Sequence, residues 1–118
     1  MISFDDFFNR QLQSRSLFEA ILAEMDQIGP AEVRVMKSQI VFRRKKDFAW
    51  VWIPGRYLPG KVAPLVLSLA FLYRHTSPRW KEVVEPYPGR FMHHLELFNI
   101  EDIDDEVRGW LKECWERS

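Results

Sequence analysis

The chain has 118 residues, 17 basic and 17 acidic side chains, and an apolar fraction of 47%. These values are typical of a globular domain, and the balanced charge excludes a strongly basic nucleic-acid protein on bulk charge alone. A chain of this length buries roughly two-thirds of its unfolded surface, so it needs neither a metal nor a disulfide to fold. We therefore expect a single domain over residues 1–118.

The location of the protein is indicated by its cysteine content and its apolar runs. The single cysteine, Cys114, excludes an intramolecular disulfide and suits a reducing compartment. No apolar run approaches the roughly 18 residues of a membrane span. The first residues, Met1 to Asp6, are acidic where a secretory signal is basic. We expect a cytoplasmic protein without a membrane partner.

Two helices are predicted before residue 30. Ser3 and Asp6 have the spacing of a capping box, and a second capping signal stands at Ser16. The second helix is expected to end at Gly29, which precedes a proline. The apolar positions at helical spacing are Phe4, Phe7, Phe8 and Leu12 in the first helix and Leu17, Ile21, Met25 and Ile28 in the second.

The middle of the chain has the two-residue period of β-strands. Strands are expected near residues 32–36, 39–43, 48–53, 65–71 and 91–98, and a short helical turn is expected at Ser77-Pro78. Pro86 and Pro88 make the stretch after Trp80 a poor central strand. An apolar stripe from Ile103 to Cys114 predicts a C-terminal helix. The predicted fold is α+β: an antiparallel sheet of about five strands with the N-terminal helices and the C-terminal helix packed on one face.

Two predicted hairpins gather basic and aromatic side chains on one face of the sheet. A two-residue turn at Lys37-Ser38 and a four-residue loop at 44–47 set the registers. The shared face, called here the basic-aromatic face, comprises Arg34, Met36, Val41, Arg43, Phe48, Trp50 and Trp52. Residues 32–90 carry twelve basic and four acidic side chains, whereas both flanking segments are acidic. If the basic segments share a face, this pattern produces a basic surface for an anionic partner; the alternative is that acidic helix starts merely oppose basic turns.

Three interpretations of the basic-aromatic face remain open. Arginines and stacked aromatic rings on a sheet bind single-stranded nucleic acid in several kinds of module. The same mixture of residues is typical of protein interfaces, so the face is alternatively a homo-oligomeric or docking surface. In the third interpretation, the proline-rich loop after residue 53 and Trp80 cover the tryptophans, which then belong to the core.

The histidines of the last predicted strand suggest two further sites. His93 and His94 point to opposite faces, so they cannot bind one metal as neighbours. His94 and Glu96 share a face but lack a third ligand, which makes a metal site or an enzyme built on His93, His94 and Glu96 the least favoured hypothesis. His93 is either a core histidine or, with Arg90 nearby, part of an anion site.

The motifs together resemble a bacterial domain of unknown function. They are Lys37-Ser38-Gln39, Phe48-Ala49-Trp50-Val51-Trp52, and His93-His94-Leu95-Glu96-Leu97, followed by Asp104 and Trp110-Leu111. The resemblance spans nearly the whole chain and implies one α+β domain without an established activity. In the family motif, the strand histidine corresponds to His93 and the basic residue before the second strand to Lys37.

The sequence favours a non-catalytic binding domain that recognises an anionic ligand or nucleic acid and uses no cofactor. The predicted ligand-binding residues are Arg34, Lys37, Arg43, Trp50, Trp52, Arg90 and His93. No catalytic nucleophile with a visible base and no glycine-rich phosphate loop occurs in the sequence.

Overall fold

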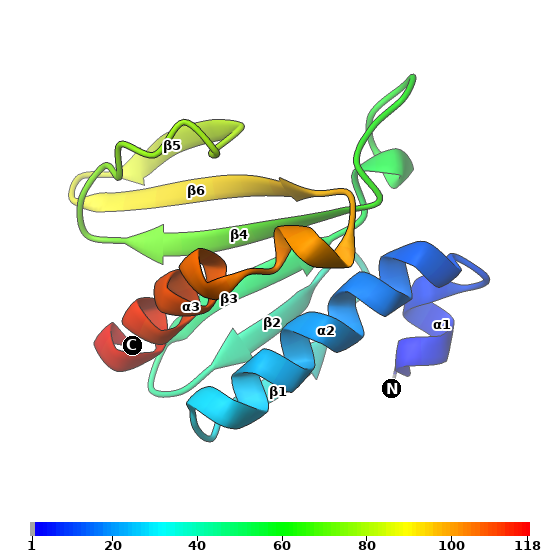
Figure 1. Cartoon of the computed structure of the whole chain (residues 1–118), viewed down its shortest axis with the longest axis horizontal. Coiled ribbons are helices and arrows are strands. Elements are labelled where there is room, and N and C mark those ends of the chain that lie inside the picture. Colours follow the sequence, from blue (N-terminus) through cyan, green and yellow to red (C-terminus); the bar gives the residue numbers. More distant parts are fainter. Residues whose placement is uncertain (1) are drawn as a thin grey trace.

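The structure is a computed structural model that describes residues 2–118, and these residues form one six-stranded antiparallel sheet and three α-helices (Figure 1). The elements, with two short 3-10 helices, are α1 (Phe4–Phe8), α2 (Leu12–Ile28), β1 (Glu32–Val35), β2 (Ile40–Arg43), β3 (Asp47–Trp52), η1 (Pro54–Arg56), β4 (Leu65–Phe71), β5 (Glu82–Tyr87), β6 (Arg90–Leu97), η2 (Ile100–Asp102) and α3 (Asp105–Arg117). No helix within residues 2–118 is long and apolar enough to cross a membrane.

The sheet has the strand order β1-β2-β3-β4-β6-β5. The expectation of about five strands is corrected by β5, which contains Pro86. A proline lacks the N–H that a central strand needs, but β5 is an edge strand that pairs only with β6. Its pairing is also irregular between Val84 and Tyr87. The edge position therefore explains how a proline-containing segment joins the sheet.

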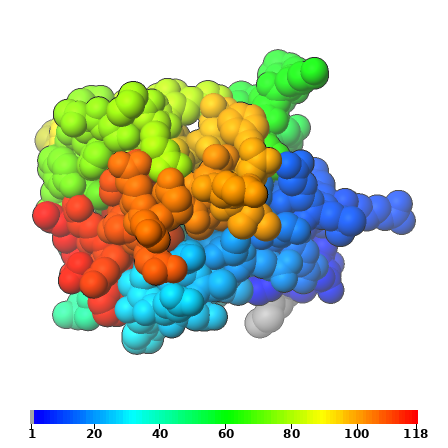
Figure 2. All heavy atoms as spheres, in the orientation of Figure 1, coloured from blue at the N-terminus to red at the C-terminus, as the bar shows by residue number. Residues whose placement is uncertain are grey.

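The core lies between the helices and one face of the sheet. In Figure 1, α2 and α3 cross in front of the strands, and in Figure 2 their atoms cover the middle of the same side. The buried cluster combines helix residues such as Phe18, Ile21 and Leu111 with sheet residues such as Val51 and Leu67. The apolar side chains of alternating strand positions thus face the helices.

The first hairpin has the predicted register, because Arg34 pairs with Val41 and Glu32 with Arg43. The second hairpin differs from its prediction near the turn. Val41 pairs with Trp50 as expected, but the register shifts after Phe42, so that Arg43 pairs with Asp47. A β-bulge of this kind places an extra residue in one strand and re-aims its side chains.

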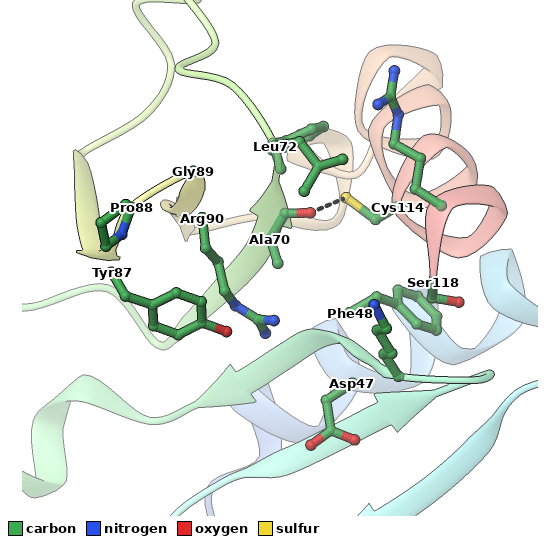
Figure 3. A pocket seen from close by; sticks show the side chains of 13 residues that line it. Asp47, Phe48, Ala70, Leu72, Tyr87, Pro88, Gly89, Arg90, Cys114 and Ser118 are labelled. Atoms are coloured by element: carbon green, nitrogen blue, oxygen red, sulfur yellow. Dashed lines mark hydrogen bonds between the residues drawn. The ribbon is translucent and has the colours of Figure 1, made fainter.

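The bulge removes Phe48 from the basic-aromatic face. Phe48 is 2% exposed and belongs to the core cluster. Its ring lies beside Ser118 at the end of α3 (Figure 3). The strict alternation assumed from the sequence fails at this residue because the turn is shorter than the predicted loop.

The helix boundaries confirm two capping predictions and correct a third. Ser3 and Asp6 form the predicted capping box of α1, and α2 ends before Gly29. However, α2 begins at Leu12, so Ser16 lies inside the helix rather than at its start. Leu12 is 76% exposed and does not share the buried face of α1. The chain turns earlier than predicted because Asn9 and Arg10 adopt left-handed backbone angles.

The predicted C-terminal stripe is confirmed, since Val107, Trp110, Leu111 and Cys114 are buried in α3. Asp104 caps this helix by accepting a hydrogen bond from the Val107 N–H. The turn expected at Ser77-Pro78 is present, at Pro78 and Arg79.

Candidate functional site

The face of the sheet opposite the helices carries a polar and aromatic row. Trp50, Ser68 and His94 are register partners across β3, β4 and β6. Trp52 lies two residues from Trp50 on the same face, with its ring edge-to-face with His94 at 6.1 Å between centroids. We call the surface formed by Trp50, Trp52, Ser68 and His94 the outer face. Both tryptophans are partly buried there.

A hydrogen-bond relay joins three of these side chains. The Trp52 Nε1–H donates to Ser68 Oγ at 3.0 Å, and Ser68 Oγ lies 2.6 Å from His94 Nδ1. An indole nitrogen can only donate, so the single Ser68 proton is free to point to His94. Burial lowers the pKa of His94, which favours the neutral imidazole that accepts this proton.

Arg90 at the start of β6 contacts two aromatic rings. Its guanidinium carbon lies 5.6 Å from the Trp50 ring centroid and 5.7 Å from that of Tyr87. These distances are those of cation–π contacts. Arg90 forms no ion pair within residues 2–118, because none of the carboxylates there lies within 4.0 Å of it.

Arg90 also lines a cleft of about 310 Å³ at the end of the sheet. The cleft lies between the β2–β3 turn, the β5–β6 turn and the C-terminal part of α3 (Figure 3). Its apolar walls include Phe48, Leu72 and Tyr87, and its charged residues are the basic Lys46, Arg90 and Arg117 and the acidic Asp47. Arg117 is paired with Glu113 at 3.5 Å, whereas Lys46 forms no ion pair in the described chain.

The other predicted basic residues are engaged elsewhere. Arg34 pairs with Glu32 at 2.9 Å, and Arg43 pairs with Asp47 at 3.1 Å. Lys37 lies exposed in the β1–β2 turn, where its carbonyl accepts a hydrogen bond from Arg56. The structure therefore brings Arg90 and Trp50 together but leaves Arg34, Arg43 and Lys37 toward the other edge of the sheet.

His93 lies on the helix-covered face, apart from the outer face, and is 0% exposed. Its Nε2 accepts the His75 N–H at 2.9 Å, and its Nδ1 faces the Phe91 carbonyl at 3.1 Å. Both ring nitrogens are thus occupied inside the protein. Trp80 packs against His93 in this core, 4.9 Å between centroids, so Trp80 does not cover the outer face as the sequence had suggested.

The histidine and acidic side chains do not assemble into a metal centre. Glu96 is paired with Lys81 at 3.4 Å, while His93 and His94 point to opposite faces. Among residues 2–118, no three histidine, cysteine or acidic side chains are placed to hold a metal ion. Cys114 is buried, and this burial raises the pKa of its thiol, so it is an unreactive core residue.

The profile of the family "Domain of unknown function (DUF5655)" matches residues 4–118. The chain belongs to this family. No curated protein and no solved structure matches the chain significantly. The family description names no activity, so the function of this DUF5655 domain has to be argued from the geometry of its site.

Ser68 of this DUF5655 site was not predicted from the sequence, and Lys46 belonged only to a weaker signal, a basic turn able to bind phosphates. Ser68 is the one polar residue of the strand Leu65–Phe71, and that isolation was the available signal of a buried hydrogen bond. Lys46 belongs to the basic turn Arg43–Lys46, but its place beside Arg90 depends on strands that are distant in sequence. Neither partner can be identified without the strand order.

Proposed function

We propose that this DUF5655 domain is a small cytoplasmic, non-catalytic binding module for an anionic ligand. The proposed site comprises the outer face around Trp50 and the adjoining cleft with Arg90 and Lys46. It retains Trp50, Trp52 and Arg90 from the sequence prediction and assigns Arg34, Arg43 and Lys37 a weaker, peripheral role.

The proposal depends on the surroundings of the Arg90 guanidinium. Its guanidinium rests against Trp50 and Tyr87 and has no carboxylate partner in the described chain. A guanidinium held by aromatic rings is oriented in advance and can form paired hydrogen bonds with a phosphate or carboxylate. Lys46 supplies a second unpaired charge in the same cleft.

The proposal predicts binding that depends on salt and on Arg90. Single-stranded and duplex oligonucleotides are titrated into the protein at low and physiological salt, followed by tryptophan fluorescence and anisotropy. Binding is expected to quench Trp50 and to weaken steeply as salt rises. Arg90→Gln is expected to weaken binding about tenfold or more, because hydrogen bonds to charged groups contribute about 1.5–3 kcal/mol.

Arg34→Gln is the matched control, since it removes one arginine from the same sheet but one that is paired with Glu32. It is expected to change the affinity by less than about threefold, because exposed pairs contribute little. Equal losses for both variants would indicate a diffuse charge effect. The absence of binding at either salt would overturn the proposal.

A second candidate function is docking to another protein chain through the outer face. Met36, Tyr57 and Leu58 are 48%, 55% and 42% exposed, and the Tyr57 ring lies 6.5 Å from that of Trp52. This continues the aromatic surface beyond the sheet. The candidate predicts an oligomer by light scattering that is lost in Trp50→Ala or Trp52→Arg; a monomeric wild type would contradict homo-oligomerisation.

A further inference from the structure

The relay on the outer face favours one protonated nitrogen in His94. Trp52 Nε1 donates to Ser68 Oγ, and among the described residues His94 Nδ1 is the only acceptor in contact with the buried Ser68 hydroxyl, so the Ser68 proton is directed to Nδ1. In the neutral ring the remaining proton is then on Nε2. The buried serine thus holds His94 in one orientation and one tautomer.

The outward nitrogen of His94 is a donor without a protein partner. His94 Nε2 forms no hydrogen bond within residues 2–118, yet every buried side-chain nitrogen or oxygen there has one. Nε2 is therefore not fully buried, and the ring as a whole is partly exposed. The His94 ring is oriented through Nδ1 by Ser68, while Nε2 is left without a protein partner. Such a donor is suited to recognising an acceptor on a ligand.

The charges around His94 indicate what kind of acceptor fits. Glu82 is its register partner on β5, and Glu96 lies two residues away on the same face. Lys81 pairs with Glu96, which leaves Glu82 as the uncompensated charge. A second anion is disfavoured beside a carboxylate, so the geometry suits an uncharged acceptor such as a carbonyl oxygen.

We propose that His94 donates a hydrogen bond from Nε2 to an uncharged base acceptor of a single-stranded nucleic acid whose phosphate is held by Arg90. Trp50, where the Arg90 guanidinium lies, and His94 stand two strands apart in one row, a separation of about 10 Å. An isolated phosphate cannot reach both positions, whereas neighbouring nucleotides of a strand can. This inference rests on the proposed anion-binding function and names its ligand.

The test compares two probes with the same phosphates. One is an oligothymidine, whose bases carry carbonyl acceptors, and the other is an abasic oligomer of the same length. His94→Ala is expected to weaken oligothymidine binding about tenfold and to leave the abasic oligomer unchanged. His94→Gln is expected to restore part of the loss, because its amide also donates. Arg90→Gln is expected to weaken both probes.

Each outcome separates this inference from the proposed function. Equal losses for the two probes in His94→Ala would assign His94 a structural role and overturn the base contact. No loss in His94→Ala, with a loss in Arg90→Gln, would overturn the inference and leave the proposed function standing. If the wild type binds the abasic oligomer as tightly as oligothymidine, base recognition is excluded. If it binds neither, both proposals fall.

A second measurement checks the donor without any ligand. Long-range ¹H–¹⁵N NMR spectra distinguish the protonated from the bare nitrogen of each histidine ring. In the wild type at neutral pH, His94 is expected to carry its proton on Nε2, and Ser68→Ala is expected to give a mixture of tautomers. A proton on Nδ1 of wild-type His94 would overturn the inference.

Discussion

His93 and His94 are neighbours in β6, and the alternation of a strand sends them to opposite faces. His93 faces the helices, where Phe71 and Trp80 surround it, with ring centroids at 4.7 and 4.9 Å. His94 faces outward, where Ser68 orients it. The same residue type is thus a core side chain at one position and a candidate ligand contact at the next.

The lowered pKa values of His93 and His94 predict that the free energy of unfolding decreases in mild acid. Burial lowers the pKa of His93 and of His94, so the unfolded chain binds protons first as the pH falls. The free energy of unfolding is expected to be level above the ordinary histidine pKa of about 6.5 and to decrease below it. Urea denaturation at about pH 7.5 and about pH 5.5 measures this, above the range where ordinary carboxylates protonate.

The control for this prediction is His94→Gln, which removes one of the two groups and keeps a donor on the outer face. It is expected to reduce the pH dependence of unfolding without abolishing it, since His93 remains. Equal stability of the wild type at both pH values would contradict the effect of burial on these two groups.

At the scale of the elements, α2 and α3 meet the β2–β3 turn around one tryptophan. Trp115 donates from Nε1 to the Pro30 carbonyl at 2.9 Å, and the Arg44 guanidinium lies 3.9 Å from its ring centroid. The ring passes so close to Gly29 that a Cβ there would lie 2.3 Å from Trp115 Cζ2. Gly29 therefore ends α2 and also leaves room for α3.

This contact predicts a non-additive pair of substitutions. Gly29→Ala is expected to lower the free energy of unfolding by about 1–3 kcal/mol, the usual cost of overpacking. In a Trp115→Phe background the clashing ring atoms are absent, so the same change is expected to cost clearly less. Denaturant unfolding of the four proteins gives the coupling energy. An equal cost of Gly29→Ala in both backgrounds would show that the ring is not the cause.

At the scale of the whole molecule, the strands of the sheet differ in how far pairing and burial shield them from solvent. β4 is paired on both sides by β3 and β6, and six of its seven residues are buried. The edge strands β1 and β5 have one neighbour each and hold no buried residue. Edge strands present unpaired N–H and C=O groups, which natural sheets protect by short length, proline or charge. Pro86 and the irregular pairing between Val84 and Tyr87 serve this purpose in β5.

Amide hydrogen exchange is expected to be slow in the central strands and fast in the edge strands. Amides of β3, β4 and β6 should exchange most slowly, close to the rate set by global unfolding, and those of β1 and β5 much faster. Mass spectrometry of peptides at two protein concentrations measures the pattern. Protection of β5 as strong as that of β4, rising with concentration, would indicate that a second copy covers this edge.

The sequence by itself determined most of the element types and most of their faces, with β5 as the exception. Capping at Ser3, the stop at Gly29 and the stripe of α3 are local signals, set by backbone sterics and by periods of 3.6 and 2 residues. The register of the first hairpin followed from a short turn in the same way. Such features depend on neighbours within a few residues, so they can be read from the chain.

Only the tertiary structure decided which side chains meet in the site. The pairing of β4 with β6 brings Ser68 to His94, residues far apart in sequence, and the strand order places Arg90 over Trp50. The bulge that removes Phe48 from the basic-aromatic face also depends on how the turn fits the core. Long-range pairing is set by the packing of the whole chain, which a local pattern does not contain.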